Sequence, residues 1–240
     1  MRDSFIETTA ILVDGGFYRR RAFNLFGDKS PEQRANELVE YCRRHLTYGQ
    51  DSPCSHLYRI FYYDCPPIAG NLYHPLLQKP INMGKTDTFK WSSEFLRALA
   101  SKRKVAIRLG ELQEGESGYR LKDKIVKRLC RNEMSFSDLK ESDFELNIVQ
   151  KGVDMRIGLD IASIAQKRLA TQIVLIAGDS DFVPAAKYAR REGIDFVLDP
   201  MWQVVRPDLN EHVDGLRSCV AKTPDPSKER LHVDYCESAK

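Results

Sequence analysis

The chain has 240 residues, of which 42% are hydrophobic and 30% are charged, and its formal net charge is +3. This length suits one domain with a sizeable insertion, and the composition is typical of a globular protein rather than a disordered or fibrous one. No apolar run reaches the ~18 residues of a membrane-spanning helix, and acids stand where a signal peptide needs an apolar stretch. The six cysteines are scattered without a C-x-x-C pair, which favours reduced thiols. We therefore expect a cytoplasmic protein that does not associate with membranes.

Apolar runs alternate with segments of helical spacing along most of the chain. The predicted elements, in chain order, are a strand at 9–13, a helix at 31–48, a strand at 57–63, a helix at 89–100, strands at 104–109 and 144–149, a helix at 153–165, a strand at 173–177, a helix at 184–191 and a strand at 194–198. The segment between 64 and 86 reads as a loop. Strands without polar alternation are covered on both faces, so the pattern predicts βαβ units around a parallel sheet.

Residues 110–145 interrupt this alternation. A turn at 115–118 predicts a hairpin with residues 119–121, and the basic stretch that follows has helical spacing. From residue 222 onward the chain is polar. We expect one domain over residues 1–220, with an inserted hairpin and basic helix at about 110–145, and a polar C-terminal tail over residues 221–240.

Aspartates follow two of the predicted strands. Asp14 comes directly after the first strand, and Asp179 and Asp181 follow the strand at 173–177. The carboxyl ends of parallel strands meet at one edge of a sheet, so these side chains are expected to converge. Asp154 opens the helix before the second of these strands, either as a helix cap or as a fourth member of the group.

Converging carboxylates repel one another unless a cation lies between them. A ligand set made only of oxygen suits Mg²⁺ or Mn²⁺. Such ions bind phosphate oxygens and activate water, so the sequence predicts phosphodiester hydrolysis at this edge.

Three blocks of the sequence carry a resemblance to a known family. They are ILVDGG at residues 11–16, KGVD at residues 151–154 and LIAGDSDFVP at residues 175–184. In order and context they resemble the signature blocks of NYN domains, which belong to the PIN-like nuclease superfamily. The resemblance implies a three-layer α/β/α sandwich around a central, mainly parallel sheet, as in PIN-like and Rossmann-like folds, and an acidic Mg²⁺ or Mn²⁺ site that cleaves RNA.

The resemblance also implies roles for single residues. The catalytic and metal-binding acids would be Asp14, Asp154, Asp179 and Asp181. Ser180 would support a neighbouring carboxylate or cap the next helix. Asp160 falls on a frequently acidic position, but it lies about 240° around the helix from Asp154, so it would contact a ligand residue rather than the ion. Phe17 stands where many relatives have Asn.

Basic residues gather in two places. Arg19 and Arg20 follow Asp14 within one short segment. On the inserted helix, one face carries Lys124, Lys127, Arg128 and Arg131. A basic stripe is typical of a surface that binds a phosphate backbone, although a run of like charges is also typical of a solvated helix face.

The leading hypothesis is therefore a divalent-metal-dependent ribonuclease that cuts RNA endonucleolytically. The alternative is a catalytically weak or inactive NYN-like module that binds RNA or a protein partner, and Phe17 keeps it open. A phosphatase of the haloacid-dehalogenase type would need a second aspartate at the position of Gly16. Association with a second copy of the chain or with another protein is compatible with either hypothesis.

Overall fold

A computed structural model describes residues 7–47, 55–113 and 118–220. The expected polar tail over residues 221–240 and most of the expected turn at 115–118 lie outside the described residues. Within the described part of the chain, no helix is long and apolar enough to cross a membrane.

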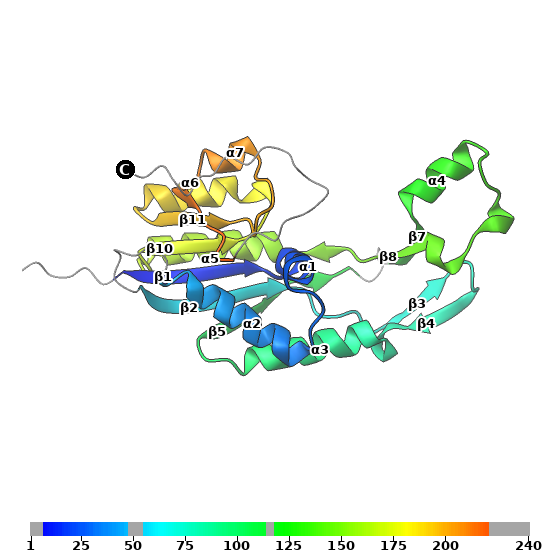
Figure 1. The fold of residues 1–240 in the computed structure, drawn as a ribbon, viewed down its shortest axis with the longest axis horizontal. Helices are drawn as coiled ribbons and strands as arrows, with labels where there is room; N and C mark the ends of the chain where they lie inside the picture. The colour runs from blue at the N-terminus through cyan, green and yellow to red at the C-terminus, as the bar shows by residue number, and fades with distance from the viewer. Residues whose placement is uncertain (1–6, 48–54, 114–117, 221–240) are drawn as a thin grey trace, which may run out of the picture.

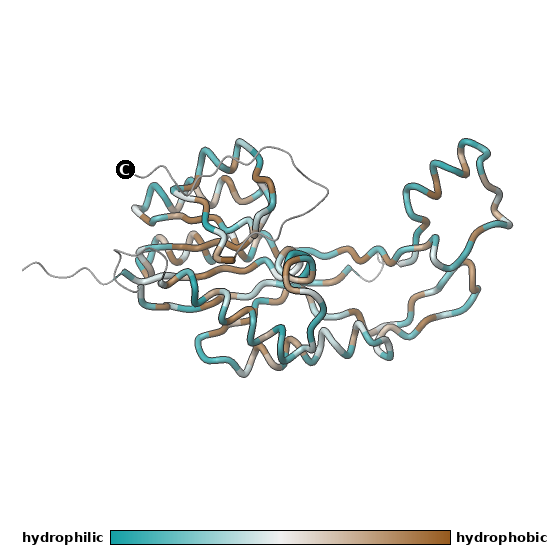
Figure 2. The backbone as a smooth tube through the Cα atoms, in the orientation of Figure 1, coloured by the Kyte–Doolittle hydropathy of each residue, from teal (hydrophilic) through white to brown (hydrophobic). Residues whose placement is uncertain are grey.

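The centre of the molecule is a six-stranded sheet in which every pair of neighbours is parallel. Its order is β12-β11-β10-β1-β2-β5 (Figure 1). The bounds are β1 Thr8–Asp14, β2 His56–Asp64, β5 Val105–Leu109, β10 Gln172–Ile176, β11 Asp195–Asp199 and β12 Gly215–Leu216. The strongest hydrophobic segments of Figure 2 follow β1, β10 and β11. The predicted parallel sheet is therefore confirmed, with β1 among its central strands.

Helices cover both faces of the sheet, which confirms the three-layer sandwich. Successive residues of a strand point to opposite faces, so Ile11 and Val13 pack under one layer while Ala10 and Leu12 pack under the other. The first layer contains α1 (Gly15–Phe26), α2 (Pro31–Arg44) and α3 (Asp87–Ala100). The second layer contains α5 (Val153–Gln166), α6 (Val183–Arg191) and α7 (Pro207–Asn210).

The helix α1 begins where the sequence indicated only a turn. Asp14 ends β1 and caps α1, because its Oδ1 accepts a hydrogen bond from the backbone N–H of Phe17 at 3.0 Å. A Cβ atom on Gly15 would lie 2.5 Å from the ring of Tyr62, so the chain can turn this closely against β2 only with glycine here. The strand therefore passes into the helix without a loop.

The segment between 64 and 86 is more ordered than the loop expected from its sequence. It contains an antiparallel hairpin formed by β3 (Asn71–His74) and β4 (Lys79–Asn82), followed by the 3-10 turn η1 (Met83–Lys85). The ring of His74 lies 4.4 Å from that of Tyr119, so this hairpin packs against the insertion.

The insertion forms an arm that extends beyond the carboxyl ends of the strands (Figure 1). Its elements are β6 Glu111–Leu112, β7 Gly118–Leu121, α4 Asp123–Cys130, η3 Phe136–Asp138, η4 Glu141–Asp143, β8 Phe144–Asn147 and β9 Gln150–Lys151. The basic helix is present, but the expected hairpin that pairs 119–121 across the turn at 115–118 is wrong. These residues pair with β8, and β6 pairs with β9, which gives an antiparallel ribbon. The helix α4 belongs to the segment that connects β7 to β8 at the far end of this ribbon (Figure 1).

Candidate active site

The candidate site lies at the carboxyl edge of the sheet, beside the junction of β1 and α1. Val13 pairs with Ile176, so the ends of β1 and β10 are adjacent. Asp14 ends β1, and Asp179 follows β10. Asp181 lies in the 3-10 turn η5 (Ser180–Phe182). Parallel neighbours thus bring together acids that are far apart in the sequence.

The charges of these acids act on one another. Burial is the main cause that raises the pKa of Asp14; the hydrogen bond from Phe17 lowers it, and the negative charge of Asp154 raises it further. Burial also raises the pKa of Asp154, followed by the charges of Asp179 and Asp181. The negative charge of Asp154 therefore acts on Asp14, and the charges of Asp179 and Asp181 act on Asp154.

Oxygen donors and an excess of negative charge fit Mg²⁺ or Mn²⁺ chemically. However, no three His, Cys, Asp or Glu side chains of the described residues are arranged to hold a metal ion. Asp179 Oδ1 accepts the N–H of Asp181 at 3.2 Å, and Asp14 is engaged as the cap of α1. The carboxylates therefore line the sheet edge without defining a coordination geometry.

Two further acids end strands at the same edge, and both are compensated. Asp64 at the end of β2 is 1% exposed and forms a bidentate ion pair with Arg19, with both N–O distances at 3.1 Å. It also accepts hydrogen bonds from the hydroxyl of Tyr62 at 2.9 Å and the N–H of Cys65 at 2.8 Å. The rule that selected Asp14, an acid at the end of an apolar strand, applies equally to Asp64, which sequence reasoning missed.

Asp199 at the end of β11 is the second compensated acid. It is fully buried and accepts hydrogen bonds from the hydroxyl of Tyr41 at 2.5 Å and of Ser218 at 2.9 Å. His45 Nε2 lies 2.9 Å from it. These contacts fasten the chain beyond β11 to α2. Asp14, Asp154, Asp179 and Asp181 have no arginine or lysine partner of this kind among the described ion pairs.

Phe17 fills the space between the ends of β1 and β10. Its side chain is buried, and a Cβ atom added to Gly178 would lie 2.5 Å from its Cε2 atom. Gly178 is therefore required for this contact with the ring rather than for a left-handed backbone. An apolar ring thus packs directly against the residue before Asp179.

The other predicted residues fall in different surroundings. Asp160 Oδ2 accepts hydrogen bonds from the hydroxyl of Tyr63 at 2.7 Å and from Arg108 Nε at 3.3 Å, so it holds α5 onto the sheet. The side chain of Ser180 lies outside the described residues. Arg20 is exposed, and its charge lowers the pKa of Asp14. The inserted helix exposes its whole basic face, formed by Lys124, Lys127, Arg128 and Arg131.

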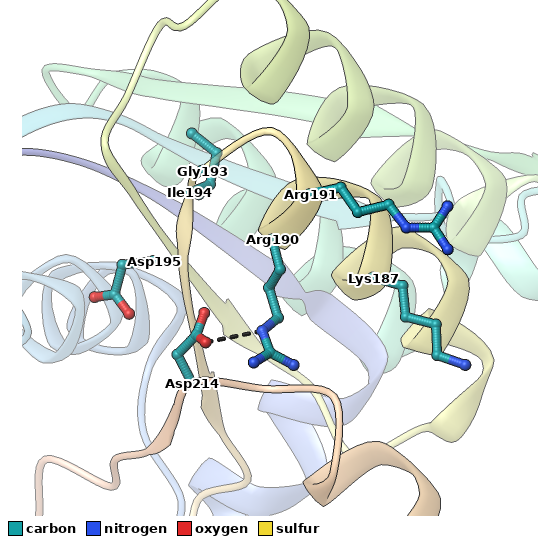
Figure 3. Close-up of a pocket in the computed structure, with 7 residues that line it drawn as sticks. All are labelled: Lys187, Arg190, Arg191, Gly193, Ile194, Asp195 and Asp214. Atoms are coloured by element: carbon teal, nitrogen blue, oxygen red, sulfur yellow. Dashed lines mark hydrogen bonds and ion pairs between the residues drawn. The ribbon is translucent and has the colours of Figure 1, made fainter.

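A wide hollow of about 750 Å³ lies elsewhere, at the amino end of β11. It is lined by basic side chains of α6, including Arg190, which pairs with Asp214 at 2.8 Å (Figure 3). Because β11 runs parallel to β10, this hollow lies at the edge of the sheet opposite to the acids. It does not belong to the candidate site.

The parallel sheet between two layers of helices is a three-layer α/β/α sandwich, a fold consistent with the PIN-like type. Residues 85–201 match the model of the NYN domain family, which confirms the resemblance seen in the sequence blocks. The matched range includes Asp154, Asp179, Asp181 and the arm, whereas Asp14 precedes it.

One solved structure, a protein of unknown function from Vibrio parahaemolyticus, is 14% identical to the chain with a TM-score of 0.45. Its alignment covers 90% of this chain and 94% of the Vibrio chain. No curated protein matches the sequence.

Proposed function

We propose that the protein is a divalent-metal-dependent ribonuclease that hydrolyses phosphodiester bonds within RNA strands. The observation that carries the proposal is the division among the acids at the carboxyl edge. Asp64 and Asp199 have cationic or hydrogen-bonding partners, while four others share a region in which burial and mutual repulsion raise the pKa of Asp14 and of Asp154. Such a group is costly to maintain unless a cation binds it.

In this proposal Asp14, Asp154, Asp179 and Asp181 hold Mg²⁺ or Mn²⁺ and orient the phosphate of the substrate. A bound ion of this kind polarises a phosphoryl oxygen and lowers the pKa of a bound water. The Phe17 N–H fixes the orientation of the Asp14 carboxylate. The exposed guanidinium of Arg20 offsets the charge of an approaching phosphate.

The exposure of the site favours cutting within a strand. Asp154, Asp179 and Asp181 are exposed, so a continuous strand can lie across the edge without presenting an end. The basic face of α4 offers a second place for the backbone, beyond the site along the arm. Counterion release from such contacts supplies affinity without sequence preference.

Cleavage of labelled circular single-stranded RNA tests this proposal, because a circle has no ends for an exonuclease. We expect linear products with Mn²⁺ or Mg²⁺ and none with EDTA. Asp154→Asn and Asp179→Asn should each reduce the rate by about 100-fold or more, since each removes a ligand charge. Asp208→Asn is the matched control, because Asp208 is an exposed acid of α7 that contacts Arg206. Equal activity of all four proteins would contradict the proposal.

The alternative, a module that binds RNA or a protein partner without cutting, is favoured by Phe17. Its buried ring leaves no side-chain polar group where many relatives place an amide. Tight RNA binding with an intact circle in Mn²⁺, unchanged by Asp179→Asn, would support this alternative over the ribonuclease.

A further inference from the structure

A cavity of about 510 Å³ lies between the core and the arm, where the first turn of α3 meets the ribbon. Its walls are mostly apolar. Met83, Phe89 and Trp91 contribute from the side of α3, and Tyr119, Leu146 and Ile148 contribute from the arm. This volume lies within the ~300–1,000 Å³ typical of small-ligand sites.

The cavity adjoins the acidic edge. Arg19 and Cys65 line it, and both contact Asp64 at the end of β2. A Cβ atom on Gly110 would lie 3.1 Å from the sulfur of Cys65 and 2.9 Å from Val153, the residue before Asp154. One end of the cavity therefore lies next to the helix turn that carries Asp154.

The chemistry of the lining suits a flat aromatic group with a polar rim. Trp91 is held by stacking on Phe95, with ring centroids 5.2 Å apart, and by donation from its Nε1 to the carbonyl of Lys29 at 3.0 Å. Its ring is thus fixed before any ligand binds. Thr88 and Gln150 add hydrogen-bonding groups to the lining.

We propose that this cavity binds one unpaired base of the RNA strand whose backbone crosses the acidic edge. The inference rests on the proposed function for the identity of the strand. Aromatic rings stack on any base, and an open polar rim can read its edge. Paired bases are not available to such a cavity, so the arm restricts the enzyme to single strands and sets the distance from the bound base to the cut. A carboxylate-rich peptide is disfavoured, because Arg19 is already paired with Asp64.

Fluorescence of Trp91 tests the proposal without cleavage. The sequence has two tryptophans, Trp91 and Trp202, so Trp202→Phe leaves Trp91 as the reporter in the full-length protein. In EDTA, a single-stranded RNA should quench this fluorescence. A series of the same RNA with one abasic position at a time should contain a position at which the quench is lost and affinity falls about tenfold, the loss of one stacked base.

Variants of the cavity give the decisive comparison. Phe89→Ala and Tyr119→Ala should bind intact RNA about as weakly as the wild type binds the abasic RNA. Each variant should therefore have the same affinity for the intact and the abasic RNA. Tyr73→Ala is the matched control, because Tyr73 is a tyrosine of β3 that is 59% exposed and lies outside the cavity lining. Tyr119→Leu keeps apolar bulk at this position and so controls for collapse of the arm. This variant should also bind the intact and the abasic RNA with equal affinity.

Equal binding and equal quenching by every abasic RNA would overturn the proposal, as would quenching by peptides but not by RNA. The result is separable from the ribonuclease assignment. Cleavage that is indifferent to every abasic position would refute the base cavity and leave the nuclease intact. Base-dependent quenching without cleavage in Mn²⁺ would refute the nuclease and leave the cavity.

Discussion

The contact between Phe17 and Gly178 makes a sharp prediction about the geometry of the acidic edge. In Gly178→Ala, the new Cβ would lie 2.5 Å from Phe17 Cε2 and 3.1 Å from Gln203 Nε2. The Gln203 side chain is exposed and can move away, but the ring of Phe17 is buried in the core. Overpacking of this kind costs about 1–3 kcal/mol. We expect the melting temperature to fall by about 2–4 °C for each kcal/mol lost.

A double-mutant cycle measured by urea unfolding assigns the cost to this contact. Phe17→Leu alone should destabilise the protein by about 1–2 kcal/mol, because it removes buried ring atoms. In the double variant the alanine methyl occupies the space left by the ring, so the two costs should fall short of additivity by about 1 kcal/mol or more. The matched control is Gly158→Ala in α5, where an added Cβ meets no atom within 4 Å. That change should stabilise the protein by about 0.5–1 kcal/mol, as expected for glycine inside a helix.

The same substitution should affect RNA cleavage more than folding. Relief of the clash moves the end of β10 relative to Asp14, and displacements near 1 Å at a reacting site can cost about 100-fold in rate. The reasoning fails if Gly178→Ala is as harmless as Gly158→Ala, or if its cost is unchanged by Phe17→Leu. The packing of Phe17 against Gly178 would then not be what excludes a side chain at this position.

Two further predictions concern charge. Changing Lys124, Lys127 and Arg128 of α4 to alanine should reduce the slope of log K for RNA binding against log salt concentration by about 2. Fluorescence anisotropy at several salt concentrations measures this slope. An unchanged slope would show that the basic face of α4 is solvated and does not bind RNA. Burial and the charge of Asp154 raise the pKa of Asp14 above its ordinary value of 3.8, so the folded state of the metal-free protein takes up this proton more readily than the unfolded state. The resulting stabilisation is complete below pH 3.8 and is lost as the pH rises through the raised pKa. Asp14→Asn should therefore raise the melting temperature in EDTA at pH 7 and lose this advantage near pH 4, and a lower melting temperature at pH 7 would contradict it.

The sheet could be predicted from the sequence because most residues of its central strands β1 and β10 are apolar. Residues 9–13 and 173–177 are buried on both faces of the sheet. A strand in this position needs apolar residues at successive positions, and such a run is visible in the sequence. The sequence of the helix α1 has no comparable apolar pattern. Its sequence begins with two glycines and contains three consecutive arginines, and its stability comes from the burial of Phe17 and Tyr18 against the sheet.

The pairing in the arm could not be predicted for a different reason. The nearest turn signal favoured a short hairpin, whereas β7 pairs with β8 across the whole of α4. The rings of Tyr119 and Phe144 lie 4.4 and 5.0 Å from the ring of His74. The partner that holds the ribbon in this register therefore comes from the β3–β4 hairpin, far away in the sequence.

The acidic edge was predictable as a meeting place of carboxylates, but not as a site with a definite membership. Asp14 and Asp64 carry the same local signal, an acid at the carboxyl end of an apolar strand. The bidentate pair with Arg19 and the hydrogen bond from the Tyr62 hydroxyl, both made by Asp64, distinguish them. The partners that compensate a carboxylate come from tertiary contacts, which the sequence does not show. The spacing in the sequence therefore selects the candidate acids, and the folded structure decides which of them keep an unpaired charge.

The three consecutive arginines after the first strand show that the sequence also does not reveal which basic residues are paired. In the sequence they form one basic cluster beside Asp14. On α1 each residue is rotated by about 100° from the one before it, so the three side chains go to different places. Arg19 pairs with Asp64, and Arg21 donates from its Nε to the carbonyl of Met201 at 3.0 Å. Arg20 is the exposed member of the three, so it is the one whose charge remains available to a phosphate.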